Sequence, residues 1–228
     1  MGQKGIFVTG TDTGIGKTFV SALLISKLKA KGINCFYYKP ISTGCELVNG
    51  KLMSEDLIFI NKSTNSNFPP EISTPIKYQI PASPLLASIE EKKEIDVKNI
   101  IQQFRKLSDN YQFVIVEGIG GIMVPITKNY FVFDLIYDLN LPALVVARAV
   151  LGTINHTLMS LTLLKQKGIK ILGFLTNGEK PENDPTVSTN HKVIEEITGV
   201  RFLGHVPFVK NMDPNIDSSI ADSIIANI

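Results

Sequence analysis

The stretch from residue 5 to residue 38 constrains the fold more than any other part of the chain. An apolar run, GIFVT (5–9), leads into the glycine-rich segment TGTDTGIGKT (9–18), and apolar residues at helical spacing follow as far as Gly32. A second apolar run, INCFYY (33–38), comes next. A strand, a glycine turn, a helix and a strand in this order predict a right-handed crossover onto a parallel neighbouring strand.

The same alternation resumes in the second half of the chain. Further apolar runs that predict strands are FVIVE (113–117), ALVVA (143–147), KILGFLTN (170–177) and FLGHVPF (202–208). Helical patterns occupy residues 54–60, 82–91, 96–108, 156–168 and 184–198, whereas residues 61–84 hold five prolines and predict mostly loop. Strands that are apolar throughout and separated by helices predict a doubly wound, mostly parallel α/β sheet covered on both faces. We expect a single domain over residues 1–228.

Each predicted strand ends in a polar or glycine-rich tip. The five tips are Thr9, Lys39, Glu117, Arg148 and Asn177. Ligands of open parallel sheets bind at the carboxyl ends of the strands. If these strands share one sheet, their tips converge on one cleft.

The glycine-rich segment has the parts of a phosphate-binding loop. Glycines let backbone N–H groups approach an anion, a helix N-terminus attracts it, a lysine adds a cation, and a threonine hydroxyl binds Mg²⁺. Gly16, Lys17 and Thr18 supply the last parts in order. The usual pattern, G-x-x-x-x-G-K-[ST], requires glycine where Thr11 stands, and Gly10 lies one residue further back. The segment is therefore a variant loop, and the alternative is an ordinary turn with a surface lysine.

Composition argues against several classes of partner. The formal net charge is +2 and no basic run exceeds two residues, so we expect no nucleic-acid partner. No apolar run approaches the length of a membrane helix, and the N-terminus has no signal-peptide pattern. The two cysteines, Cys35 and Cys45, form no CxxC motif, which favours reduced thiols in a cytoplasmic protein.

Six motifs together resemble one enzyme family. They are GTDTGIGKT (10–18), YKPISTG (38–44), PASPLLA (81–87), VEGIGG (116–121), LGTINH (151–156) and TNGE (176–179). In this order and at these distances they closely resemble dethiobiotin synthetase, from Gly5 to about Pro207. The resemblance implies a P-loop fold and a homodimer with small-molecule substrates. It also implies an ATP-dependent ligase that converts 7,8-diaminononanoate, CO2 and MgATP into dethiobiotin, ADP and phosphate.

The resemblance implies roles for the charged residues at the strand tips. Lys17, Lys39 and Thr11 are the expected catalytic residues, because a carbamate must approach a triphosphate and phosphoryl transfer depends on positioning and electrostatic stabilisation. The expected Mg²⁺ ligands are Thr18, Asp56 and Glu117. Glu55 is adjacent to Asp56 and is the alternative ligand.

Further residues match the family's binding segments. Those expected to bind substrate are Thr43, Gly118, Gly120, Gly121, Leu151, Gly152 and Asn155. Those expected to bind nucleotide are Asp12, Thr13, Gly14, Ile15, Gly16, Lys17, Thr18, Asn177 and Pro207. A plain helix cap at Asn155 is compatible with its expected role. The family usually has alanine where this chain has Ile119, which affects the expected shape of the pocket.

Three rival interpretations remain. A ParA/MinD-like switch ATPase would carry a second lysine where this chain has Asp12. An amide-forming ligase of cobyrinic acid synthesis would need a glutamine-hydrolysing domain, and a scaffold protein could retain the loop without turnover. The histidines predict no site: we interpret His156 and His205 as structural and His191 as a surface residue.

Overall fold

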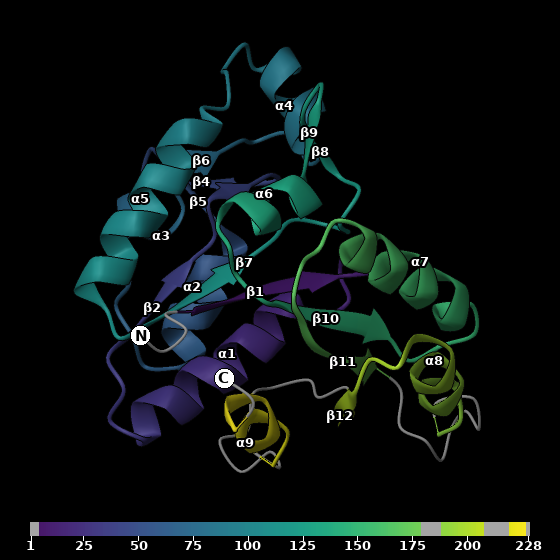
Figure 1. Cartoon of the computed structure of the whole chain (residues 1–228). Helices are drawn as coiled ribbons and strands as arrows, with labels where there is room; N and C mark the ends of the chain where they lie inside the picture. Colours follow the sequence, from purple (N-terminus) through teal and green to yellow (C-terminus); the bar gives the residue numbers. More distant parts are fainter. Residues whose placement is uncertain (1–4, 179–187, 208–218, 227–228) are drawn as a thin grey trace.

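The computed structural model describes residues 5–178, 188–207 and 219–226. In this part of the chain six parallel strands form a central sheet in the order β12-β11-β10-β1-β7-β2 (Figure 1). The strands are β1 (Gly5–Gly10), β2 (Cys35–Tyr38), β7 (Phe113–Glu117), β10 (Ala143–Arg148), β11 (Ile171–Gly178) and β12 (Phe202–Pro207). The predicted parallel α/β sheet is confirmed.

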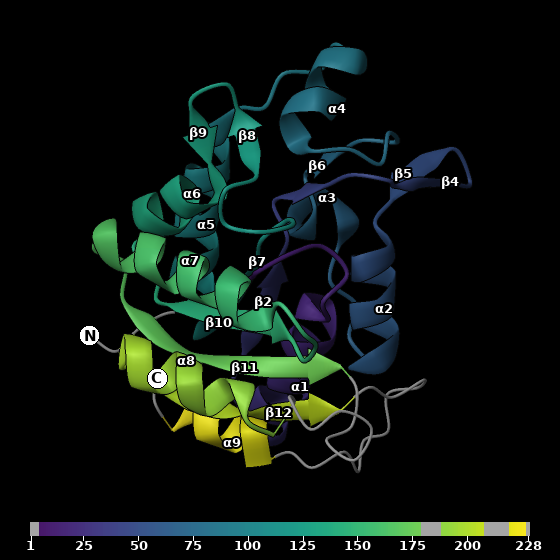
Figure 2. The ribbon, with the colours of Figure 1, turned by 90° about the vertical axis from the view of Figure 1, so that its right-hand side faces the viewer.

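Helices cover both faces of this sheet (Figures 1 and 2). On one face α1 packs against β1, β2 and β7, and both α2 and α9 pack against α1. On the other face lie α5, α6 and α7, and α8 packs against α7 and β12. The helices are α1 (Lys17–Ala30), α2 (Glu55–Ser63), α3 (Pro70–Ser73), α4 (Pro84–Glu90), α5 (Val97–Asn110), α6 (Val132–Asp138), α7 (Thr153–Gln166), α8 (Asn190–Thr198) and α9 (Ser219–Ile225).

Apolar spacing and an acidic cap explain why α5 forms. Ile100, Phe104 and Leu107 recur at helical intervals and are buried against the core. Asp96 is the N-cap, and its Oδ1 accepts a hydrogen bond of 3.0 Å from the backbone N–H of Asn99. Such a helix can be predicted from sequence, because its capping residue and its apolar residues lie within a few positions of one another.

The strands at the centre of the sheet are buried on both faces. Every residue of β1 and β7 is buried, and in β10 only Arg148, the last residue, is exposed. This burial accounts for their continuous apolar runs. The expectation that β1 and β2 are direct neighbours is wrong, because β7 lies between them and pairs with both. The connection from β1 to β2 passes over the position of one strand, and the apolar runs do not indicate that β7 occupies this position.

Several small elements differ from the sequence-based prediction. The segment predicted as loop contains α3 and β6 (Ile76–Lys77), and β6 pairs with β3 (Ile41–Ser42). Two short hairpins and α6 were not predicted; the hairpins are β4 (Glu46–Val48) with β5 (Lys51–Met53), and β8 (Pro125–Thr127) with β9 (Tyr130–Phe131). Elements this short contain too few residues for a recognisable period.

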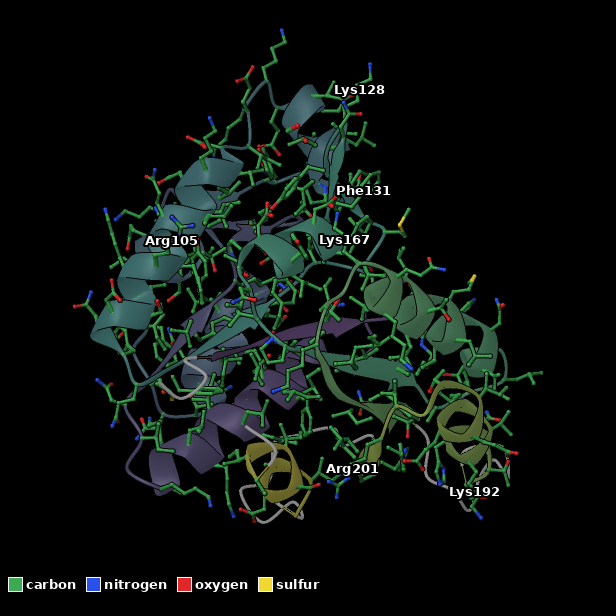
Figure 3. All side chains as sticks on the ribbon, in the orientation of Figure 1. Arg105, Lys128, Phe131, Lys167, Lys192 and Arg201 are labelled. Carbon is green, nitrogen blue, oxygen red and sulfur yellow. The ribbon has the colours of Figure 1, made fainter. Side chains whose placement is uncertain are left out.

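Two predicted helices have different starts. α7 begins three residues before the predicted start, at Thr153. α8 is described from Asn190, and residues 184–187 of its prediction lie outside the described residues. Helix α7 is also tied to α6 by an ion pair in which Lys167 Nζ lies 2.7 Å from Asp134 Oδ1 (Figure 3). Within the described ranges, no helix has both the length and the apolar character needed to cross a membrane.

Candidate active site

The glycine-rich loop joins the end of β1 to the start of α1. Gly16 is the N-cap of α1 and has a left-handed backbone conformation, with φ of +93°. A Cβ atom added at Gly16 would lie 1.8 Å from Asn177 Nδ2. Both the conformation and the close approach therefore require glycine at this position.

Side chains from two other strand tips hold this loop. Asn177 at the end of β11 donates a hydrogen bond of 2.8 Å from Nδ2 to the carbonyl oxygen of Ile15. Arg148 at the end of β10 donates from Nη2 to the carbonyl oxygen of Thr13 at 3.4 Å. These two contacts join the loop to the carboxyl edge of the sheet.

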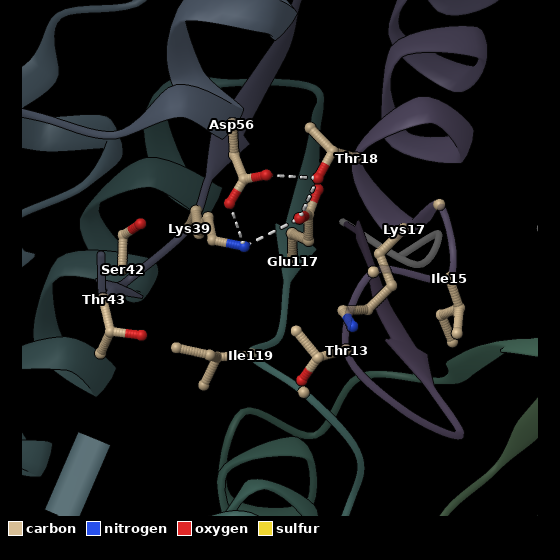
Figure 4. Close-up of a pocket in the computed structure, with 13 residues that line it drawn as sticks. Thr13, Ile15, Lys17, Thr18, Lys39, Ser42, Thr43, Asp56, Glu117 and Ile119 are labelled. Carbon is tan, nitrogen blue, oxygen red and sulfur yellow. Dashed lines mark hydrogen bonds and ion pairs between the residues drawn. The ribbon is translucent and has the colours of Figure 1, made fainter. Parts of the chain in front are cut away.

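A cavity of about 170 Å³ lies beside the loop (Figure 4). The loop, β2, α2 and β7 and their flanking segments contribute its lining, which consists of Thr13, Gly14, Ile15, Gly16, Lys17, Thr18, Lys39, Ser42, Thr43, Asp56, Glu117, Ile119 and Gly120. Helix α1 has 14 residues, and its first two, Lys17 and Thr18, line this cavity, so the N-terminal end of the helix lies there. Helix N-termini attract anions, so the position suits a phosphate group.

Lys39 lies between two carboxylates in the wall of the cavity. Its Nζ is 2.7 Å from Asp56 Oδ2 and 2.9 Å from Glu117 Oε1. Burial alone would lower the pKa of Lys39, but the two carboxylates outweigh it and raise that pKa above its ordinary value. Burial likewise opposes ionisation of Asp56, yet Lys39 lowers the pKa of Asp56 overall. Lys39 and Asp56 are therefore charged, and Glu117 completes this cluster of three ionisable side chains.

Lys17 is the second lysine of the cavity. Its Nζ donates a hydrogen bond of 2.8 Å to the carbonyl oxygen of Asp12. Burial first, and the charge of Lys39 second, lower the pKa of Lys17 to about 8. An anion bound beside Lys17 would favour its charged form, so ligand binding and protonation of this lysine are coupled.

The hydroxyl of Thr18 lies between the same two carboxylates. Its Oγ1 is 2.7 Å from Asp56 Oδ1 and 2.8 Å from Glu117 Oε1. A hydroxyl has one proton, so it can donate to only one of the two oxygens. Three converging oxygens, two of them from carboxylates, fit a hard cation such as Mg²⁺.

A metal ion at this position would depend on more than acidic side chains. Among the described residues, no group of three histidine, cysteine, aspartate or glutamate side chains could hold a metal ion. Mg²⁺ usually takes one or two carboxylates and fills its other positions with water and substrate phosphates. The converging oxygens of Thr18, Asp56 and Glu117 provide one hydroxyl and two carboxylates, which is a ligand set of this kind.

A wider groove of about 640 Å³ lies on the other side of the loop. It runs between the loop, residues 121–125 and helix α7. Its lining is more apolar than that of the first cavity and consists of Thr11, Asp12, Gly121, Ile122, Met123, Val124, Pro125, His156, Met159, Ser160 and Leu163. The cavity of about 170 Å³ and this groove thus meet at the glycine loop.

Comparison with known proteins identifies the family. A family model described as "AAA domain" matches residues 4–215. The chain is 38% identical over 233 residues to the ATP-dependent dethiobiotin synthetase BioD of Thermodesulfovibrio yellowstonii, which covers 99% of this chain and 96% of the relative. It is 43% identical to the enzyme of the same name from Methanococcus vannielii, over 88% of this chain and 92% of the relative.

The chain belongs to the dethiobiotin synthetase family. Comparison with solved structures shows which fold the chain has. The cell division protein MinD of Aquifex aeolicus superposes with a TM-score of 0.61 at 15% identity, covering 98% of this chain and 96% of that one. MinD of Pyrococcus furiosus gives a TM-score of 0.58 at 16% identity, over 99% of both chains. The predicted P-loop fold is confirmed, and at these identities the likeness shows the fold alone, so it does not favour the switch-ATPase alternative.

The structure brings together most residues that the dethiobiotin synthetase motifs predict. Thr43 and Gly120 line the cavity of about 170 Å³, and Thr11 and Gly121 line the groove. Gly118 lines neither of them and is buried, with its carbonyl oxygen 3.4 Å from Lys39 Nζ. Of the two alternatives for the acidic ligand, Asp56 faces Thr18 and lines the cavity. Glu55 is exposed.

The residues expected to bind substrate at the start of α7 lie outside both cavities. Leu151, Gly152 and Asn155 are exposed, Leu151 to 85%, and they line neither cavity. Gly152 is the N-cap of α7, so Asn155 lies inside the first turn of the helix and is not its cap. The structure therefore does not bring these three expected substrate-binding residues into either cavity.

The predicted base-binding residues lie at neighbouring strand ends. Asn177 is in β11 and Pro207 ends β12, where it pairs in register with Gly178. The amide of Asn177 already contacts the loop, which the sequence did not predict.

The histidines also differ from expectation. His156 is exposed and lines the groove, so its structural interpretation is wrong. His191 is partly buried and stacks on Phe202 with ring centroids 4.1 Å apart, so it is not a plain surface residue. His205 Nδ1 lies 3.0 Å from Thr176 Oγ1, as a structural role requires.

Sequence reasoning missed three residues around the cluster. Ser42 lines the cavity, and Ser21 and Tyr37 contact Glu117 from behind. Two of them left a signal. Ser21 lies three residues after Thr18 on the same helix face, and Tyr37 lies two residues before Lys39, the spacing of one strand face.

Proposed function

We propose that this chain is an ATP-dependent ligase that forms dethiobiotin from 7,8-diaminononanoate and CO2, with release of ADP and phosphate. The observation that carries this proposal is the match to ATP-dependent dethiobiotin synthetases over 99% of the chain. The charged cavity beside the glycine loop supports it.

The chemistry divides into three steps in which the substrate supplies each nucleophile. One amine of the diamine adds to CO2 and loses a proton, which gives a carbamate. A carbamate oxygen attacks the γ-phosphorus of ATP, and the bond from that phosphorus to the β,γ-bridging oxygen breaks. ADP leaves, and a carbamic-phosphoric anhydride is formed. The second amine attacks the carbonyl carbon, phosphate leaves, and the cyclic urea closes. The protein's task is to position anions and stabilise charge.

Lys17, Lys39 and Thr11 carry the catalytic part of the proposal. Lys17 and Lys39 bring two cations to one cavity, where they would offset repulsion between the carbamate and the triphosphate. Thr11 lies at the junction with the groove, where the carbamate must meet the phosphate. Because the nucleophiles belong to the substrate, no side-chain nucleophile is needed.

Thr18, Asp56 and Glu117 would hold Mg²⁺ through the oxygens that converge beside Lys39. When bound, the ion would neutralise charge on the phosphate oxygens of ATP. The same carboxylates contact the ammonium of Lys39. We infer that they orient this lysine toward the cavity as well as forming the metal site.

The remaining contacts divide between nucleotide and diamine. We propose that loop residues 12–18 bind the phosphates and that Asn177 and Pro207 flank the base at the ends of β11 and β12. We propose that Thr43, Gly118, Gly120 and Gly121 border the diamine. The expected partner-reaching residues at the start of α7 are Leu151, Gly152 and Asn155.

Three further properties belong to the proposal. A homodimer is supported by the exposed apolar side chains of Met123 and Met159 in the groove and of Leu151 just before α7. A single domain is supported by one hydrophobic core cluster that includes residues from all six strands of the central sheet. A cytoplasmic location is supported by the two buried free thiols, Cys35 and Cys45.

The test is to incubate the protein with MgATP and bicarbonate, with and without 7,8-diaminononanoate. Phosphate release and product mass are followed together. We expect phosphate release that depends on the diamine, and a product with the mass of the cyclic urea. ATP hydrolysis that is indifferent to the diamine would contradict the ligase proposal and would favour the switch-ATPase alternative.

A further inference from the structure

Both oxygens of the Glu117 carboxylate are contacted, and they face different surroundings. Oε1 lies 2.8 Å from Thr18 Oγ1 and 2.9 Å from Lys39 Nζ, toward the cavity. Oε2 accepts hydrogen bonds from Ser21 Oγ at 2.8 Å and from the Tyr37 hydroxyl at 3.1 Å. Two donors from α1 and β2 therefore engage the oxygen that points away from the cavity.

The phenol is the more rigid of these two donors. The oxygen of a tyrosine lies in the plane of its ring, so its position is set by how the ring packs. The Tyr37 ring is fully buried and packs against Phe68, with ring centroids 6.4 Å apart. A serine hydroxyl, by contrast, can rotate about its Cα–Cβ bond. Tyr37 thus limits rotation of the Glu117 carboxylate more strongly than Ser21 can.

We propose that Tyr37 is a positioning residue for a divalent cation. Together with Ser21 it holds Oε2 of Glu117, so that Oε1 stays directed at the oxygens of Thr18 and Asp56. This inference rests on the proposed function, in which Glu117 is a metal ligand. Loss of a partner that orients a metal ligand typically lowers metal affinity by about 10- to 100-fold.

The neighbouring residue separates this role from mere burial. Tyr38 is also fully buried, and its hydroxyl donates to the carbonyl oxygen of Ile100 at 3.2 Å. Successive side chains of a strand point to opposite faces, so Tyr38 reaches α5 while Tyr37 reaches Glu117. Replacing either tyrosine with phenylalanine removes one buried hydroxyl from the same strand. Only the change at position 37 affects the carboxylate.

The experiment measures Mn²⁺ binding by electron paramagnetic resonance, with a non-hydrolysable ATP analogue present. We expect Tyr37→Phe to raise the Mn²⁺ dissociation constant by about tenfold. We expect Tyr38→Phe to change it by less than about twofold. In EDTA, a fluorescent ATP analogue should bind both variants as it binds the wild-type protein, because the glycine loop is intact in each.

Two more variants make the outcome decisive. Ser21→Ala removes the other donor to Oε2 and should also weaken Mn²⁺ binding, which gives a second test if Tyr37→Phe folds poorly. Glu117→Gln tests the metal ligand itself. If Glu117→Gln weakens Mn²⁺ binding but Tyr37→Phe and Ser21→Ala do not, the positioning role is refuted and the metal site stands. If Glu117→Gln binds Mn²⁺ as the wild type does, the metal assignment of the proposed function fails.

A further result would refute the inference on other grounds. Equal losses of Mn²⁺ affinity in Tyr37→Phe and Tyr38→Phe would show that any lost hydroxyl in this strand loosens the site. Loss of metal-free nucleotide binding in Tyr37→Phe would likewise indicate a general change in structure rather than a change at Glu117.

Discussion

Replacing Lys39 with methionine removes the positive charge between Asp56 and Glu117 and keeps a linear side chain. In the wild-type protein the ammonium lies 2.7 Å from Asp56 Oδ2 and 2.9 Å from Glu117 Oε1. Without it the two carboxylates face each other across the hydroxyl of Thr18, which has one proton, while Oε2 of Glu117 keeps its contacts with Ser21 and Tyr37. We expect Lys39→Met to lose ligase activity and also to lose stability in the absence of metal ions.

The burial of the cluster sets the size of this effect. The side chains of Lys39 and Glu117 are 5% and 0% exposed, whereas that of Asp56 is 34% exposed and can be hydrated. Breaking a buried ion pair by removing one partner costs about 3–5 kcal/mol, and the exposure of Asp56 favours the lower end. For a chain of this size, about 3 kcal/mol lowers the midpoint of thermal unfolding by roughly 6–12 °C.

Magnesium should restore part of this loss. A divalent ion that binds between the freed carboxylates replaces the missing positive charge, and a ligand that binds only the folded state raises its stability. In the wild-type protein the same ion must compete with the ammonium. We therefore expect added Mg²⁺ to raise the unfolding midpoint of Lys39→Met more than that of the wild type, measured by calorimetry in EDTA and in Mg²⁺.

Lys167→Met is the matched control. It removes the ion pair with Asp134, but the Lys167 side chain is 35% exposed (Figure 3) and does not line the cavity. We expect a small change in stability that does not depend on Mg²⁺. If Lys39→Met unfolds at the wild-type midpoint in EDTA, the repulsion between Asp56 and Glu117 does not destabilise the protein, and the prediction is wrong. Equal Mg²⁺ shifts in Lys39→Met and wild type would place the cation elsewhere.

Three shorter predictions follow from the loop and the groove. Gly16→Ala places a Cβ against Asn177 and should weaken ATP binding about tenfold by calorimetry, whereas Gly32→Ala, which has open space, should not. Unchanged ATP affinity in Gly16→Ala would contradict the role of that contact. Lys17→Ala should abolish diamine-dependent phosphate release while the circular dichroism spectrum stays that of a folded protein; retained turnover would contradict the loop assignment. Sedimentation should show a dimer at assay concentration, and an active monomer would contradict a shared site.

Much of the fold could be predicted because its signals are local. Apolar runs such as FVIVE identify strands buried on both faces, and the cap at Asp96 with its apolar stripe identifies α5. The order of the strands could not be predicted, since β1, β2 and β7 have similar apolar runs. Short elements such as α6 could not be predicted either, because seven residues span only two helical turns.

The residues of the candidate site were predictable to a similar degree. Strand tips and the glycine loop pointed to Lys17, Lys39 and Glu117, and motif resemblance added Asp56. The sequence left Glu55 as an alternative, because adjacent residues differ only in which side of α2 they face. It also missed Tyr37, whose role depends on a partner eighty residues away.

The sequence by itself determined the loop, the strands and the chemistry available at their tips. The conformation of a turn, the spacing of apolar residues in a helix and the apolar character of a strand are recorded in residues close together in sequence, so a linear pattern is enough to predict them. Only the tertiary structure decided that β7 lies between β1 and β2, and with it that Glu117 meets Lys39 on one side and Tyr37 on the other. Such contacts depend on the order of strands in the sheet, which long-range packing selects and no local pattern records.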